Sequence, residues 1–135
     1  MNYLLDTCIL SYYFRKEKGI IEQFQMKHPE DIKISSITFM EIEYGLYLNS
    51  NVEKKIRPIW KKLLEQIEVL LFNDDDAKMS AIIRGQLKQA GQLIGPYDIL
   101  LAGTALSRHL IFVTANTKEF SRIKNLSLEN WCGRY

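Results

Sequence analysis

The sequence holds few residues of the kinds that build disulfide frameworks, zinc sites or membrane spans. Its 135 residues include two cysteines and two histidines, with neither a C-x-x-C pair nor a Cys/His cluster, so zinc and disulfide scaffolds are disfavoured. No apolar run approaches the roughly 18 residues that span a membrane. The first ten residues lack a basic segment and a small-residue cleavage site. We therefore expect no signal peptide, no membrane association and a cytoplasmic location.

Positive charge is modest overall, with a net charge of +2, but it is unevenly distributed. Basic side chains gather in two stretches, which contain Arg15, Lys16 and Lys18, and Lys54, Lys55, Arg57, Lys61 and Lys62. Two interpretations stay open for these stretches. They are either solvated helix faces and loops, or a rim that attracts phosphate around an acidic centre.

Short apolar runs alternate with longer segments of helical character. Strands are expected at residues 2–5, 32–36, 68–72 and 110–114, with a weak fifth strand near 126–128. Helices are expected at 38–48 with Thr38 as cap, at 50–66 with an interruption before Pro58, at 73–90, at 95–109, and after Asn116. This alternation predicts an α/β fold, a single domain over 1–135 with a mainly parallel sheet of four to five strands and helices on both faces.

Ligands of such sheets bind beyond the carboxyl ends of the strands, so acidic residues that follow strands are candidates for a functional site. Asp6 follows the first strand, although a turn or cap residue is an equally good interpretation. Glu41 projects into a gap beside two small residues, Thr38 and Gly45, on a helix that is apolar over most of its circumference. A carboxylate in that gap suggests a cavity that something cationic fills, whereas Glu43 lies in the opposite gap.

Asp98 lies in the first turn of its helix, where the helix dipole favours a negative charge, but its helical stripe continues into the face expected to pack on the sheet. An unpaired carboxylate there needs a counter-charge or a metal. Asn116 and Glu119 follow the last core strand, where they also fit a capping box. The run from Asp74 to Asp76 is best interpreted as helix capping, and both histidines as structural or surface residues.

These blocks resemble the PIN-domain ribonucleases, and among them the VapC-type toxins of bacterial toxin–antitoxin pairs. The opening strand into Asp6-Thr7 is similar to the start of the family. SSITFMEIEYGL is similar to its second block, IGPYDILLAGTAL to its third and LIFVTANTKEF to its fourth, and the tail through Trp131 resembles its end. Because the four blocks occur in the family's order and spacing, on a chain of family length, together they make the resemblance to this family specific.

The resemblance implies a Mg²⁺-dependent endoribonuclease, with Mn²⁺ as a substitute, that cleaves tRNA or ribosomal RNA and inhibits growth. It implies catalytic roles for Asp6, Glu41 and Asp98, which would also bind the metal, and for Glu119 as the fourth acid. Contacts to phosphate or to metal-bound water are expected from Thr7, Thr114 and Asn116. A homodimer and an inhibitory antitoxin partner are implied as well.

Two positions depart from the family pattern. Cys8 stands where relatives often carry Asn, two residues after the first Asp, and a thiol cannot offer the same amide hydrogen bond. Some orientation of Asp6 or of the substrate is therefore expected from elsewhere. The fourth acid is also ambiguous, because many relatives have Asp at the position of Asn116, whereas others use the position of Glu119.

Three rival functions can be weighed. A phosphohydrolase with an Asp nucleophile would need D-x-D after the first strand, where this chain has Asp6-Thr7-Cys8. A phospho-accepting receiver domain would need an acidic pair at the same place. A PIN-like RNA-binding or scaffold domain without catalysis is the third rival, and the four acids argue against it.

Overall fold

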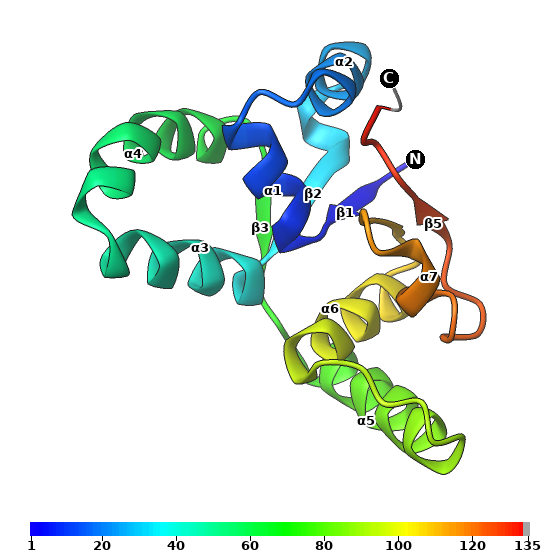
Figure 1. The fold of residues 1–135 in the computed structure, drawn as a ribbon. Helices are drawn as coiled ribbons and strands as arrows, with labels where there is room; N and C mark the ends of the chain where they lie inside the picture. The colour runs from blue at the N-terminus through cyan, green and yellow to red at the C-terminus, as the bar shows by residue number, and fades with distance from the viewer. Residues whose placement is uncertain (134–135) are drawn as a thin grey trace.

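The computed structural model describes residues 1–133, which form a five-stranded sheet with helices along both faces (Figure 1). The strands are β1 (Tyr3–Leu5), β2 (Ile32–Ser35), β3 (Glu68–Leu70), β4 (Ile111–Val113) and β5 (Leu128–Glu129). Their order is β3-β2-β1-β4-β5 and all four pairings are parallel. The predicted α/β class with a parallel sheet is confirmed, and the helices that connect the strands must cross over the sheet.

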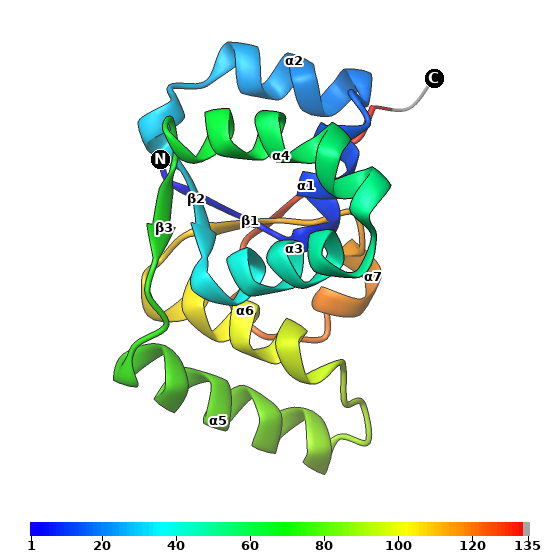
Figure 2. The same cartoon turned by 90° about the vertical axis from the view of Figure 1, so that its left-hand side faces the viewer.

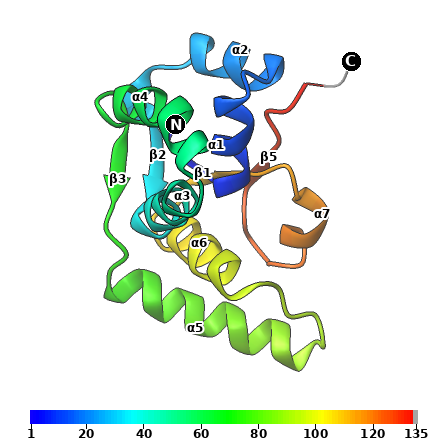
Figure 3. The same cartoon turned by 60° about the vertical axis from the view of Figure 1, so that its left-hand side comes forward.

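The helices divide into two layers, one on each side of the sheet (Figures 2 and 3). They are α1 (Thr7–Phe14), α2 (Lys18–Met26), α3 (Ser36–Leu48), α4 (Ser50–Leu64), α5 (Asp74–Gln89), α6 (Pro96–Ser107) and α7 (Thr117–Phe120). Helices α5 and α6 pack under one face, where Leu4 and Phe112 belong to the core. Helices α1, α2 and α4 cover the other face, where Leu5 and Val113 belong to a second hydrophobic core. Adjacent strand residues thus point to opposite cores, as the period of a strand requires.

Several helix boundaries differ from the sequence-based prediction. Thr38 is not the cap of α3, because Ser35 accepts the backbone N–H of Ile37 and the helix begins at Ser36. The helix expected over 50–66 begins at Ser50 and ends at Leu64, with Asn49 as its cap. Helix α4 runs through Pro58 without the expected interruption. Its amphipathic packing around buried Trp60 compensates for the backbone hydrogen bond that proline cannot make.

Helices α1 and α2 were not among the elements predicted from the sequence. The fifth strand lies at Leu128–Glu129 rather than at 126–128. Asn116 precedes α7 as predicted, but its side chain makes no capping hydrogen bond, so the proposed box with Glu119 is wrong. None of the helices within residues 1–133 is long and apolar enough to cross a membrane.

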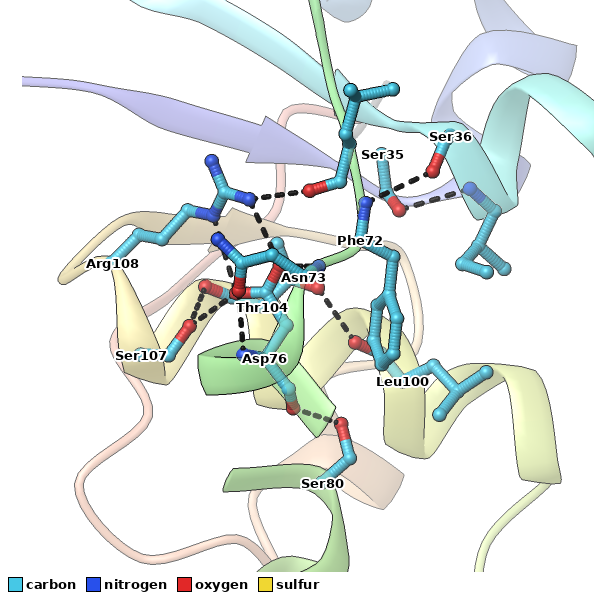
Figure 4. Close-up of polar contacts among 12 residues, drawn as sticks. Ser35, Ser36, Phe72, Asn73, Asp76, Ser80, Leu100, Thr104, Ser107 and Arg108 are labelled. Atoms are coloured by element: carbon cyan, nitrogen blue, oxygen red, sulfur yellow. Dashed lines mark hydrogen bonds and ion pairs between the residues drawn. The ribbon is translucent and has the colours of Figure 1, made fainter. Parts of the chain in front are cut away.

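The start of α5 is held by a buried carboxylate that serves the fold (Figure 4). Asn73 and Asp76 form a capping box, each side chain accepting the backbone N–H of the other. Asp76 is fully buried and also accepts from the Arg108 guanidinium at 2.9 Å and from the Ser107 hydroxyl. Arg108 in turn donates to the carbonyl of Leu71 at 2.6 Å. The capping interpretation of the run from Asp74 to Asp76 is confirmed through Asp76. The ion pair between Asp76 and Arg108 also joins α5 to the end of α6.

We expect Arg108→Met to lower the free energy of unfolding by about 3 kcal/mol, because it leaves the buried Asp76 carboxylate without its cation. The matched control is Lys33→Met, which removes the cation of a more exposed pair with Glu68 and should cost less than about 1 kcal/mol. Urea denaturation of the two variants measures both values. Equal losses would show that the Asp76 pair is not a structural anchor.

Candidate active site

The order of the strands reverses at β1, because β2 and β3 extend to one side of it and β4 to the other. Such a reversal opens a crevice between the carboxyl ends of the two diverging strands. Asp6 follows β1 and Thr114 follows β4. The Thr114 hydroxyl donates to Oδ2 of Asp6 at 2.8 Å and accepts the backbone N–H of Asn116 at 3.0 Å. Asp6 is 6% exposed, so this bond fixes a nearly buried carboxylate at the crevice.

Cys8 provides a second donor to the same carboxylate. Its thiol lies 3.2 Å from Oδ2 of Asp6 and donates to it. Burial raises the pKa of the Cys8 thiol to about 12, and the negative charge of Asp6 adds to this rise, so the thiol keeps its proton. The orientation of Asp6 was expected to come from elsewhere because Cys8 lacks an amide. The structure divides that task between Thr114 and the thiol itself.

Glu41 reaches the site from α3 and is connected to the residue that follows Asp6. The Thr7 hydroxyl donates to Oε1 of Glu41 at 2.7 Å and lies 3.1 Å from the hydroxyl of the buried Thr38. Thr38 is one helical turn before Glu41, so the small-residue gap inferred from the sequence is where α1 contacts α3. This contact with Thr7 holds the Glu41 carboxylate beside the end of β1.

Glu43 lies two residues further on and belongs to a different network. It accepts from Arg57 at 2.6 Å and from the indole N–H of Trp60 at 2.8 Å. The hydrogen bond from Arg57 holds the pKa of Glu43 below its ordinary value, against the opposing effect of burial. Glu43 therefore joins α3 to α4, whereas Glu41 faces α1.

Asp98 enters from the first turn of α6, after Gly95 and Pro96. It is half-buried, and none of the ion pairs among residues 1–133 includes it. Burial, followed by the negative charges of Asp6, Glu119 and Glu41 in that order, raises the pKa of Asp98 to about 6. The other three predicted acids therefore lie within electrostatic reach of Asp98.

The remaining predicted residues occupy different places. Thr7 and Thr114 bond directly to two of the acids, whereas the Asn116 side chain is exposed and only its backbone N–H takes part. Asp76 is elsewhere, in its pair with Arg108. Cys8 is the site residue that sequence reasoning undervalued. The available signal was its i+2 spacing from Asp6.

The donor set is one of carboxylate and hydroxyl oxygens, which suits a hard cation such as Mg²⁺ better than a soft metal. Among the described residues, no three His, Cys, Asp or Glu side chains form a compact metal cage. A cage is not required for Mg²⁺, because this ion usually keeps several waters and is held by one or two carboxylates. The mutual repulsion expressed in the raised pKa of Asp98 is what a cation would relieve, so the residues present fit such an ion.

Comparison with known proteins decides the family. A model described as PIN domain matches residues 3–126. The chain belongs to the PIN-domain family. The tRNA(fMet)-specific endonuclease VapC of Salmonella typhimurium is 35% identical over 134 residues, which cover 98% of this chain and 99% of that protein. The predicted resemblance to VapC-type ribonucleases, and with it the enzyme class of nuclease, is confirmed.

Solved structures agree with this assignment. DNA-bound VapBC from Salmonella typhimurium has a TM-score of 0.90 and 33% identity, over 98% of this chain and 99% of its own. VapBC2 from Rickettsia felis, bound to a DNA fragment from its promoter, has a TM-score of 0.89 and 32% identity, and the match covers 97% of this chain and 99% of that chain. The PIN-type arrangement of the sheet and helices is thus shared with VapC proteins along almost the whole chain.

The raised pKa of Asp98 predicts how stability depends on pH in the absence of metal. The native carboxyl binds its proton more tightly than the unfolded one, so its contribution to stability is lost as pH rises from about 4 to about 6. We expect Asp98→Asn to lack this loss and to melt at or above the wild-type temperature at neutral pH in EDTA. Thermal melts of both proteins across that pH range measure the difference. A clearly lower melting temperature for Asp98→Asn would show that Asp98 is a structural residue.

Proposed function

We propose that this protein is a Mg²⁺-dependent endoribonuclease that acts in the cytoplasm as the toxin of a toxin–antitoxin pair. One nuclease domain over 1–135 would use Asp6, Glu41, Asp98 and Glu119 as its acids. The observation that carries the proposal is the raised pKa of Asp98, caused by burial and by the other three acids, in a PIN domain whose relatives are named ribonucleases. Perturbed carboxylates gathered in one crevice are typical of active sites.

The metal would be held by Asp6 and Asp98, with Glu41 as a direct ligand or as a ligand through water, and Mn²⁺ would substitute for Mg²⁺. When bound, such an ion lowers the pKa of a coordinated water and neutralises charge that develops on a phosphodiester. Both donors to Asp6 bind the same oxygen, Oδ2, so they hold the carboxylate in one orientation and do not occupy Oδ1. Oδ1 is therefore the atom that we assign to the cation.

The other residues position groups around that centre. Thr7 donates to Oε1 of Glu41, and the second carboxylate oxygen would then accept a proton from the attacking water. Glu119, on α7, would be the fourth acid, and its charge contributes to the raised pKa of Asp98. Thr114 and the backbone N–H of Asn116 form a hydrogen-bonded chain that leads to Asp6.

The biological role rests on the relatives. The Salmonella relative is named as specific for tRNA(fMet), and tRNA or ribosomal RNA is the substrate class that we propose here. The solved relatives are VapBC assemblies, which supports an antitoxin as partner. A homodimer is supported by the apolar side chains that α3 exposes, namely Met40, Tyr44, Tyr47 and Leu48.

The alternative is a catalytically inactive PIN-like RNA-binding or scaffold domain. Single-turnover cleavage of RNA separates the two functions. We expect cleavage with Mg²⁺ or Mn²⁺ and none in excess EDTA. Cleavage that continues undiminished in chelator would rule out the metal mechanism, and binding without cleavage in Mg²⁺ would support the scaffold.

Two neighbouring glutamates provide a sharper test of the site. Glu41→Gln should lower turnover by about 10²-fold or more, the scale of a lost general base or metal-orienting group. Glu43→Gln is the matched control, because Glu43 contacts Arg57 and Trp60, and it should change turnover several-fold at most. Initial rates on the same RNA in Mg²⁺ compare the variants. The reverse pattern would place the active face of α3 on its other side.

A further inference from the structure

A groove leads away from the acidic centre and is lined by residues of α1, α3 and α4. These three helices contact one another, and Figure 1 shows their arrangement. The groove has a volume of about 460 Å³ and begins at Thr7 and Glu41, the hydrogen-bonded pair at the edge of the acidic site. Its middle is lined by apolar side chains, which are Phe14, Ile42, Leu46, Val52 and Ile56. A ligand that places one part at the acids can therefore extend along this groove.

Gly45 lines the groove one helical turn beyond Glu41. It lies inside α3 with ordinary helical backbone angles, and a Cβ built on it would meet nothing within 4 Å. Glycine is among the poorest helix formers, so its presence at a helix interior calls for a reason. Packing within the chain provides none. The bare backbone leaves room for a group from outside the chain, next to Glu41.

Two cationic side chains stand on the wall of the groove, Arg15 after the end of α1 and Lys55 on α4. Both are exposed, and neither takes part in an ion pair among residues 1–133. Arg57, only two residues beyond Lys55, is instead neutralised by Glu43 and Glu53. The structure thus selects two of the eight basic residues in the clustered stretches as the ones beside the acidic site.

We propose that this groove binds a single-stranded segment of the RNA substrate next to the phosphodiester that is cleaved. Arg15 and Lys55 bind a backbone phosphate, and a nucleobase lies against the apolar wall over Gly45. The proposal rests on the function proposed above. Two cations that form no ion pair within residues 1–133 favour a polyanion over a protein segment, and apolar walls contact base faces only where the RNA is single-stranded.

The probe is a short fluorescent single-stranded RNA that carries 2′-O-methyl groups throughout, so that it binds without being cleaved. Its dissociation constant is measured by anisotropy at constant Mg²⁺ in the inactive Asp98→Asn background. We expect Arg15→Gln with Lys55→Gln to raise this constant about tenfold and to reduce the salt dependence of log K by about one. The matched control, Lys16→Gln with Lys54→Gln, removes the same charge from adjacent positions outside the groove and should change it less than about threefold.

Filling the groove provides a test that does not depend on charge. Gly45→Leu should weaken RNA binding by about tenfold with no loss of melting temperature, because the new side chain points into open space. Gly45→Ala is the control, and it should keep the wild-type affinity within about threefold. Unchanged affinity for the charge pair and for Gly45→Leu would overturn the proposal and leave the groove to a protein partner.

The two proposals fail in different ways. If the wild-type chain cleaves RNA in Mg²⁺ but the groove variants bind as their controls do, the groove assignment alone is wrong. If the groove variants lose affinity but the wild-type chain cleaves no RNA, the groove assignment stands and the nuclease function is wrong. A duplex RNA of the same sequence should bind the wild-type protein and the groove variants with equal affinity, because it does not enter the groove, and a difference there would contradict the single-stranded assignment.

Discussion

Repulsion among like charges is the constraint around which this site is built. Asp6, Glu41 and Glu119 come from elements other than that of Asp98, and their charges, together with burial as the larger cause, raise the pKa of Asp98 to about 6. Such an arrangement is unfavourable unless donors or a cation compensate it. Part of the compensation is internal, since Thr114 and Cys8 donate to Asp6, and Thr7 donates to Glu41. We assign the remainder to a divalent cation.

A comparison of two aspartates on the same face of the sheet shows how the chain separates structural from functional acids. Asp76 is fully buried, which by itself raises its pKa, but hydrogen bonds from Arg108, Ser107 and the Asn73 backbone, with the charge of Arg108, together keep that pKa below the ordinary value. Asp98 is less buried but forms no ion pair within residues 1–133, and its pKa is raised. The Asp76 pair fixes the end of α6, while the start of the same helix presents Asp98.

Part of this arrangement could be predicted from the sequence, because residues that follow the strands of a parallel sheet gather at its carboxyl edge. Asp6 was predicted from its place after the first strand and Asp98 from its place on a helical stripe. The helical projection separated Glu41 from Glu43. Details that depend on tertiary contacts were missed. Pro58 is tolerated inside α4 because of packing around Trp60, and Asn116 leaves its cap unused. The contact of Cys8 with Asp6 requires the two side chains to turn toward each other, which spacing alone does not specify.

The central claim is that the acids form one cation site, and calorimetric titration of Mn²⁺ into the purified protein tests it most directly. We predict saturable binding that is lost in both Asp6→Asn and Asp98→Asn and retained in Asp74→Asn, which removes an exposed carboxylate from the start of α5. Equal Mn²⁺ affinity in all four proteins would contradict the claim, because the acids at the crevice would then not share a metal.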